Sequence, residues 1–486
     1  MLSARRITVI LSALLIATLS ISTSITSQAD QKDFAALDAF VEAQMRKNRI
    51  PGLALGIVHN DEVAYVKGYG QADPSGRPVD PETPFILASV SKSFTAMAVM
   101  QLVDAGLVQL DAPVQTYIPW FTVADEGAAA QITVRQLLYQ TSGLPTIAGR
   151  QQPDPDQSLE ASVRALADVS LTTAPGERFQ YSNANYNTLG LIVEQVTGQS
   201  FGQYVEAQIY APLEMTHSHV SRAEAEIDGL AAGHRTWFTF PVQETLPYVA
   251  ADLPSGFLIA SAEDMAHYLV AQLNGGQYNG MQVLSAESVA QMHTPPTGLA
   301  EPSAYAMGWA EDIVAGEEIV GHSGSLPNYL TQMLLLPDEG WGIVLLANAG
   351  SVTMRDVLLD TTGGVIDFVM GRPLPDPSFN VANLIPVAIL ALGLGAGYSL
   401  IRTPTRWRAR LEAADRPIRT ALLPLLFNAA LPVLLLVGVP AAMQTSLAVF
   451  HLIMPDIGTL LIAISIISGL QGILRFIILV RTLKPE

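Results

Sequence analysis

The chain has 486 residues, of which 49% are hydrophobic and only 14% charged, and its formal net charge is −18. Soluble domains carry about 25% charged residues, so this composition excludes an ordinary soluble protein. The charge divides the chain, because residues 31–380 carry a net −24 whereas residues 381–486 hold 9 Lys and Arg against 4 Asp and Glu. The acidic part disfavours nucleic acid as a partner, and the lack of cysteine excludes disulfides and thiol chemistry.

The N-terminus has the pattern of an export signal. Two arginines precede an apolar run over residues 7–21, and a short polar stretch ends at Ala29. We expect residues 1–29 to be a signal peptide, and an uncleaved anchor that reaches Thr26 is the alternative. In either case the signal delivers the acidic part of the chain to the outer side of the membrane.

The acidic domain, residues 30–372, begins and ends with strand patterns and has a helical middle. Apolar residues alternate on both sides of Asn60-Asp61, which predicts a hairpin, and helical spacing dominates from Ser91 to about Tyr210. The remaining predicted elements are a helix over 33–48, strands over 318–322, 330–336 and 341–348, and a helix over 354–370. This order predicts an α+β fold whose sheet is closed by both termini of the domain.

A candidate nucleophile lies at the start of the helical middle, in Ser89-Val90-Ser91-Lys92. Residues three apart on a helix share a face, so the Lys92 amine can reach the Ser89 hydroxyl. A serine is a weak nucleophile until a base takes its proton, and a lysine can be that base where burial and nearby charge lower its pKa. The plain alternative is a serine at a helix start beside a solvated lysine.

Two further triplets come later along the chain. Among 14 tyrosines only Tyr181 begins a Y-x-N triplet, which ends at Asn183. Among the histidines and lysines only His322 begins an [HK]-x-G triplet, which ends at Gly324. Each triplet alone is a weak signal, and their common order and surroundings are what point to a function.

In these three motifs and in the longer strings around them, residues 34–370 resemble a known family of serine hydrolases. The family groups class C β-lactamases, D-alanyl-D-alanine carboxypeptidases and penicillin-binding-protein-like esterases. The resemblance implies an antiparallel sheet with a helical lobe, and we expect neither a cofactor nor a metal. It includes the three motifs and the strings LLYQTSGLP (137–145), PGERFQYSNANYNTLGLIVEQVTG (175–198), SGFLIASAEDMAHY (255–268) and VGHSGSLPNY (320–329).

The resemblance also implies a role for each motif residue. Ser89 is expected to be acylated by the substrate carbonyl, with Lys92 and Tyr181 as the groups that move its proton. Asn183 is expected to orient the substrate amide or the lysine. The backbone N–H groups of Ser89 and Ser325 are expected to form the oxyanion hole, where each donor contributes about 3–4 kcal/mol.

The third motif departs from many relatives, which have a lysine where this chain has His322. A lysine offers a permanent cation to a substrate carboxylate, whereas a histidine with a pKa near 6.5 is mostly neutral at pH 7. His322 and Gly324 are therefore expected to help bind and orient the substrate. The departure weakens the case for β-lactams and for peptides with a free carboxylate, and favours esters or D-amino-acid peptides.

A pair of histidines elsewhere, His217 and His219, lacks a third metal ligand nearby in the sequence. Two histidines alone do not make a metal site, so we expect no metal here.

The C-terminal part, residues 384–486, contains three apolar stretches after a linker over 373–383. Each is long enough to cross a bilayer, so we expect a membrane-embedded tail that contacts lipid. Six arginines follow the first stretch, which by the positive-inside rule makes that loop and the C-terminus cytoplasmic and the acidic domain extracytoplasmic. The stretches are about 384–401, 421–443 and 457–478, and the arginines are Arg402, Arg406, Arg408, Arg410, Arg416 and Arg419.

The sequence thus predicts a membrane-tethered, extracytoplasmic serine hydrolase that forms an acyl-enzyme with an amide or ester. Its substrate is expected to be a small molecule or peptide outside the cell, such as a cell-wall-type D-amino-acid peptide, an ester or a β-lactam. The alternative is a non-catalytic sensor of cell-wall fragments, since three spans exceed what anchoring requires. A transporter is disfavoured because the spans contain no pair of ionisable residues and no repeat.

Overall fold

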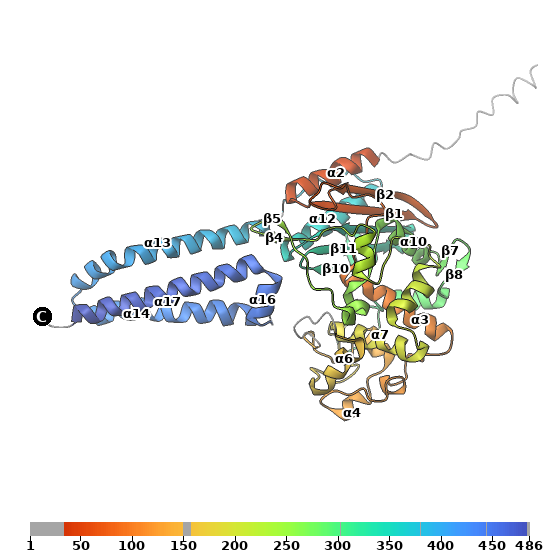
Figure 1. Ribbon diagram of the computed structural model, residues 1–486, viewed down its shortest axis with the longest axis horizontal. Coiled ribbons are helices and arrows are strands. Elements are labelled where there is room, and N and C mark those ends of the chain that lie inside the picture. Colours follow the sequence, from red (N-terminus) through yellow and green to blue (C-terminus); the bar gives the residue numbers. More distant parts are fainter. Residues whose placement is uncertain (1–33, 149–156, 302, 380, 444, 484–486) are drawn as a thin grey trace, which may run out of the picture. The chain divides into compact units, whose positions relative to one another are not determined.

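The computed structural model describes residues 34–148, 157–301, 303–379, 381–443 and 445–483. The predicted signal peptide, residues 1–29, lies outside the described residues. Two regions succeed one another along the chain, a mixed α and β domain and a C-terminal set of apolar helices (Figure 1).

A six-stranded antiparallel sheet forms the centre of the domain, in the order β2-β1-β12-β11-β10-β9. The N-terminal hairpin pairs with β12, so both ends of the domain contribute to one sheet, as predicted. Its strands are β1 (Gly52–His59), β2 (Glu62–Gly70), β9 (Ala310–Val314), β10 (Glu317–Leu326), β11 (Tyr329–Leu336) and β12 (Trp341–Ala347).

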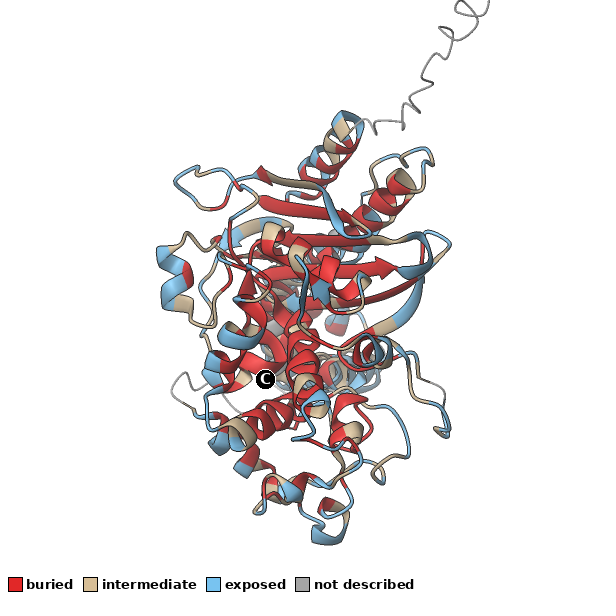
Figure 2. Cartoon of the chain, turned by 90° about the vertical axis from the view of Figure 1, so that its right-hand side faces the viewer, coloured by how far each residue is buried: buried red, intermediate tan, exposed pale blue. Residues whose placement is uncertain are grey.

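Burial along the sheet depends on the position of each strand. The apolar strand β1 is buried along nearly its whole length, while β2, at the edge, is mostly exposed or half-buried and carries charged residues that disfavour pairing with another chain. Figure 2 shows the buried residues concentrated on the strands and the central helices. Helix α10 (Ala262–Leu273) packs against β1, β2 and β12, and α12 (Val352–Val369) packs against β11 and β12.

The helical lobe fills the interval between the N-terminal hairpin and the C-terminal strands. Its central helix α3 is buried on almost every side, and α7 packs against it. The other helices of the domain are α2 (Phe34–Asn48), α3 (Ser91–Asp104), α4 (Glu126–Ala129), α5 (Val134–Leu138), α6 (Leu159–Arg164), α7 (Asn183–Thr197), α8 (Phe201–Val205), α9 (Arg222–Ile227) and α11 (Ala286–His293).

Several short strands were not predicted. A small sheet joins β4 (His234–Trp237), β5 (Phe240–Gln243) and β13 (Ala349–Gly350), and two-residue strands form two further pairs. Strands of two to four residues are too short to show an alternating pattern, which is why the sequence did not reveal them. The short pairs are β3 (Phe85–Ile86) with β6 (Ile259–Ala260) and β7 (Gln277–Tyr278) with β8 (Met281–Gln282).

In the tail, three helices are long and apolar enough to cross a membrane by length and composition. They are α13 (Ile385–Glu412), the stretch Pro417–Ala442 that comprises α14 (Pro417–Val433), η9 (Leu434–Gly438) and α15 (Val439–Ala442), and α17 (Pro455–Leu483), which comes after the short α16 (Leu447–Ile453). The prediction of a loop carrying six arginines was wrong in one respect. The arginines lie at the C-terminal end of α13 and around the start of α14, and the connection between these helices is only a short turn.

Candidate active site

The candidate nucleophile Ser89 lies in a tight turn, η1 (Ala88–Val90), directly before α3. Ala88 has a φ of +49°, a left-handed conformation that is rare for a residue with a side chain. The buried Ser91 braces this turn, because its Oγ donates to the Ala88 carbonyl at 2.8 Å and accepts from the Leu258 N–H at 3.1 Å. Ser89 itself is only half-buried, so its hydroxyl is held rigidly yet stays accessible.

Lys92 lies one turn later on α3 and is completely buried. Its Nζ donates to Ser89 Oγ at 3.3 Å, to Asn183 Oδ1 at 2.9 Å and to the Ser255 carbonyl at 2.6 Å. Ser255 belongs to η6 (Leu253–Phe257), a π-helical turn. An ammonium group has three N–H donors, and these three neutral oxygens match them. The amine is therefore fixed in direct contact with the candidate nucleophile.

Tyr181 reaches the same hydroxyl from another element. Its phenol donates to Ser89 Oγ at 2.8 Å, and the Lys92 Nζ lies 4.8 Å from the centre of its ring. Ser182 between Tyr181 and Asn183 is extended, with φ −146° and ψ 126°. Residues two apart in extended backbone share a face, so one triplet directs a tyrosine to Ser89 and an asparagine to Lys92.

A buried glutamine holds that triplet in place. Gln140 has a φ of +60° and is completely buried. Its Oε1 accepts from the Ser182 N–H at 2.9 Å and from Asn185 Nδ2 at 2.5 Å. In addition, the Tyr186 hydroxyl donates to the Leu138 carbonyl at 2.8 Å. The string at 137–145 thus supports the start of α7.

The third motif lies on β10, against the nucleophile turn. A Cβ on Gly324 would meet the Leu87 carbonyl oxygen at 2.4 Å and the Ala88 Cβ at 3.0 Å, so only a glycine fits here. Ser325, the next residue, is exposed. Ser89 follows Ala88, and Ser325 follows Gly324. Because Ala88 and Gly324 are in contact, the two residues predicted for the oxyanion hole lie close together.

His322 is buried in this strand and is 8% exposed. Its Nδ1 lies 2.8 Å from the Ser323 carbonyl and its Nε2 lies 3.3 Å from the Tyr305 hydroxyl. A carbonyl can only accept, so Nδ1 carries the proton and Nε2 accepts from Tyr305. Burial, together with the nearby charges of Lys92 and Arg355, lowers the pKa of His322 to about 3. The imidazole is therefore neutral at physiological pH.

The structure brings together all the residues predicted for the active site, and it adds others. Ser255 and Gln140 lie within strings that carried the resemblance, but nothing in the sequence marked their contacts. Tyr305 and Arg355 had no signal at all. Arg355, on α12, is exposed and its Nη2 lies 3.4 Å from Ser323 Oγ, which brings a guanidinium to the third motif.

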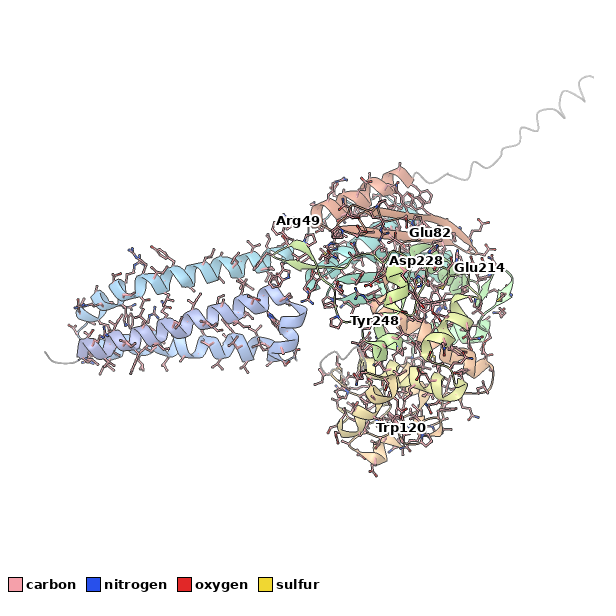
Figure 3. All side chains as sticks on the ribbon, in the orientation of Figure 1. Arg49, Glu82, Trp120, Glu214, Asp228 and Tyr248 are labelled. Carbon is pink, nitrogen blue, oxygen red and sulfur yellow. The ribbon has the colours of Figure 1, made fainter. Side chains whose placement is uncertain are left out.

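The histidine pair His217 and His219 contacts acidic side chains. His217 Nδ1 and His219 Nε2 lie 3.1 Å and 2.8 Å from Asp228 Oδ2, and His217 Nε2 lies 3.6 Å from Glu82. Asp228 and Glu82 are labelled in Figure 3. Among the described residues, no group of three or more histidine or acidic side chains has the geometry of a metal site.

A family model described as Beta-lactamase matches residues 37–363. The chain belongs to the beta-lactamase family. Its similarity to "Protein flp" of Staphylococcus aureus (strain N315) is 33% identity over 333 residues, which is 68% of this chain and 65% of that protein. This chain thus spans a little under two thirds of the length of that relative.

Two further comparisons show similarity to penicillin-binding proteins. "Penicillin-binding protein 4" of Amycolatopsis lactamdurans is 29% identical over 71% of this chain and 94% of its own length. The solved structure of the octameric penicillin-binding protein homologue from Pyrococcus abyssi has a TM-score of 0.61 at 27% identity, covering 74% of this chain and 81% of that one. The fold prediction, a penicillin-binding-protein-like α+β domain followed by three apolar helices, is therefore confirmed.

Proposed function

We propose that this protein is a serine hydrolase that cleaves an amide or ester through an acyl-enzyme on Ser89. The observation that carries the proposal is the position of Ser89 Oγ, 2.8 Å from the Tyr181 hydroxyl and 3.3 Å from Lys92 Nζ. Proton transfer needs heavy atoms about 2.6–3.2 Å apart, so the Tyr181 distance permits it directly, while Lys92 Nζ lies just beyond this range and places its charge beside the same oxygen. Membership of the beta-lactamase family supports a serine hydrolase chemistry.

In the acylation step Tyr181 is the phenolate, so the 2.8 Å hydrogen bond then runs from the Ser89 hydroxyl to the Tyr181 oxygen, and this proton passes to Tyr181 as Ser89 Oγ attacks the substrate carbonyl. The positive charge of Lys92, beside the Tyr181 ring, favours the phenolate that accepts this proton. The tetrahedral oxyanion is stabilised by the backbone N–H groups of Ser89 and Ser325. The intermediate then collapses, the bond to the leaving amine or alcohol breaks, and that group takes the proton back from Tyr181.

In the deacylation step, a water molecule takes the place of the leaving group. Tyr181 removes a proton from this water, and the resulting hydroxide attacks the acyl carbonyl on Ser89. When the ester bond breaks, Tyr181 returns this proton to Ser89 Oγ and the acid product leaves. Asn183 keeps the Lys92 amine oriented throughout, through its 2.9 Å hydrogen bond.

The substrate preference depends on which cation stands near the site. His322 is neutral and serves as a hydrogen-bonding group. The permanent positive charge that would bind a substrate carboxylate is therefore that of Arg355. Cell-wall-type D-amino-acid peptides, esters and β-lactams all present a carbonyl to Ser89, and they differ in whether a carboxylate accompanies it. We propose that the site acts outside the cell, where such substrates occur, and that the three apolar helices tether it to the membrane.

The test is covalent labelling of the full chain in membranes with two probes, a neutral fluorophosphonate and a penicillin, which carries a carboxylate. We expect both to add to Ser89, detected as a mass increase on its peptide, and no addition in Ser89→Ala. Ser75→Ala, at an exposed serine outside the site, should label normally. Arg355→Gln should slow the penicillin more than the fluorophosphonate. No label on Ser89 in folded protein would refute the proposal.

A second candidate function is a non-catalytic sensor whose tail passes on a signal. It is favoured by the hydrogen bonds that join the three tail helices, such as Gln471 Nε2 to Ser399 Oγ at 2.8 Å, which simple anchoring does not need. The intact pair of Lys92 and Tyr181 around Ser89 speaks against it, because a binder has no use for a nucleophile. A cellular phenotype that Ser89→Ala retains would favour the sensor, and one that it loses would favour the hydrolase.

A further inference from the structure

The interior of the tail contains a network of polar side chains. Asn428 on α14 donates through Nδ2 to both the carbonyl and Oγ of Ser468 on α17, each at 3.0 Å. Gln471, one turn further along α17, donates to Ser399 Oγ at 2.8 Å and to Thr403 Oγ1 at 3.0 Å on α13. Polar side chains are costly inside a membrane, and where they persist they usually serve a function.

A cation without an anionic partner completes this network. Arg475 on α17 donates from Nη1 to Asn428 Oδ1 at 2.7 Å, while its Nε is buried and makes no hydrogen bond with any described residue. None of the ion pairs found in the described part of the chain includes Arg475. A second guanidinium lies close by, because the Cζ atoms of Arg475 and Arg410 lie 5.0 Å and 5.8 Å from the ring centre of Trp407. The site therefore carries uncompensated positive charge.

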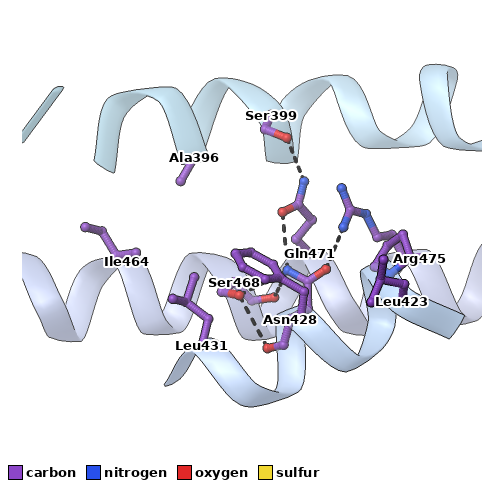
Figure 4. Close-up of a pocket in the computed structure, with 11 residues that line it drawn as sticks. Ala396, Ser399, Leu423, Asn428, Leu431, Ile464, Ser468, Gln471 and Arg475 are labelled. Atoms are coloured by element: carbon purple, nitrogen blue, oxygen red, sulfur yellow. Dashed lines mark hydrogen bonds between the residues drawn. The ribbon is translucent and has the colours of Figure 1, made fainter. Parts of the chain in front are cut away.

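Beside Arg475 the three helices leave a groove of about 560 Å³ (Figure 4). One end is polar and is lined by Arg475, Asn428 and Ser468, while the other end is lined by apolar side chains that include Leu431 and Ile464. Ile464 precedes Arg475 by three turns of α17, so the two ends lie about 16 Å apart along the helix. The polar end is the one nearer to the arginine-rich ends of α13 and α14.

This lining matches an amphiphile with an anionic head and a hydrocarbon chain. Basic pockets between transmembrane helices bind phospholipid head groups, and a phosphate supplies both the charge and the acceptors that Arg475 lacks. We propose that this groove binds one anionic phospholipid. Its phosphate accepts from Arg475 and Asn428, and an acyl chain lies along Leu431, Ile464 and Ala396 toward the middle of the tail.

The experiment uses the natural reporter Trp407 in the full chain, reconstituted into phosphatidylcholine bilayers. A small mole fraction of brominated phosphatidylglycerol is added, and its quenching of tryptophan fluorescence is compared with that by brominated phosphatidylcholine. We expect the anionic lipid to quench more. Arg475→Gln should weaken this preference about tenfold, because it removes a charge-assisted hydrogen bond. Equal quenching by the two lipids in the wild type would overturn the proposal.

Controls separate a specific site from general attraction to the surface. Arg481→Gln removes an exposed arginine from the end of the same helix and should keep the preference. Ala396→Phe fills the apolar end and should lose it while retaining Arg475. A preference that survives Arg475→Gln, or one that soluble glycerol phosphate abolishes, would contradict a phospholipid site. Labelling of Ser89 in each variant reports whether the hydrolase domain is folded.

Discussion

At the scale of single residues, His322 most restricts the chemistry of the site. Its burial removes the charge that a histidine at this place would otherwise gain in mild acid, and the cation of Lys92 opposes protonation further. The sequence indicated a mostly neutral histidine at pH 7, and the structure extends that neutrality to about pH 3. The third motif therefore acts as a hydrogen-bonding group across the whole range in which proteins function.

We predict that protonation of His322 does not shape the pH dependence of acylation. The apparent pKa values of the labelling rate between about pH 5 and 8 should be the same in the wild type and in His322→Gln, because the folded pKa lies far below the ordinary value of about 6.5. The measurement is the rate of fluorophosphonate labelling across this range. A limb near pH 6.5 that disappears in the variant would contradict the prediction.

The same shift makes a statement about stability. As the pH falls below about 6.5, His322 takes up a proton in the unfolded chain but not in the folded one, so the free energy of unfolding decreases until about pH 3. His322→Gln removes this contribution and should lose less stability over that interval. Urea unfolding of both proteins at several pH values is the check.

At the scale of elements, the site depends on the approach of β10 to the turn before α3. Gly324 touches Leu87 and Ala88 on that turn, and Ala88 is held in a strained conformation. Such strain persists only where surrounding contacts enforce it. The strand thus fixes the direction of the Ser89 hydroxyl as well as supplying the residue Ser325.

We predict that Gly324→Ala destabilises the domain by about 1–3 kcal/mol and slows labelling of Ser89 more than stability alone explains. The added Cβ would lie 2.4 Å from a backbone oxygen, so either β10 or the nucleophile turn must move. Gly363→Ala, inside α12, is the matched control, because the added Cβ would meet its nearest neighbour, the Ala315 Cβ, only at 3.9 Å. That variant should be neutral or gain about 0.5–1 kcal/mol. Equal effects of the two substitutions on labelling would refute this account.

At the scale of the whole molecule, charge and hydropathy divide along the chain. The acidic domain carries the candidate catalytic residues, whereas the tail carries apolar helices and arginines at one set of helix ends. Arginines are retained on the cytoplasmic side of membrane proteins. This asymmetry supports our proposal that Ser89 faces the outside.

The absence of cysteine from the sequence makes the topology directly testable. We predict that a membrane-impermeant maleimide labels Ala105→Cys, at an exposed position of the domain, on intact cells. Ala413→Cys, at the exposed end of α13, should be labelled only after permeabilisation. Labelling of Ala413→Cys on intact cells would place the arginines outside and reverse the proposed orientation.

Features that depend on neighbouring residues were predictable. The hairpin of β1 and β2 and the strands β10 to β12 follow from local periodicity, and the apolar helices follow from the length of their apolar stretches. The three-residue spacing indicated that Lys92 can reach Ser89. The strands β4, β5 and β13 were missed because so few residues carry no periodic signal. The contacts of Tyr305 and Arg355 were missed because no local pattern reports which distant segment a side chain will meet.

The sequence by itself determined the division into an acidic domain and an apolar tail, the α+β class and the identity of the motif residues, since these depend on composition and short-range spacing. Only the tertiary structure decided that the Lys92 amine donates both to Ser89 and to Asn183, which lies 91 residues further along the chain. It also decided that His322 stays neutral down to about pH 3 and that Arg475 faces a groove. Burial and long-range packing control these properties, because the solvation of a charge depends on everything that surrounds it.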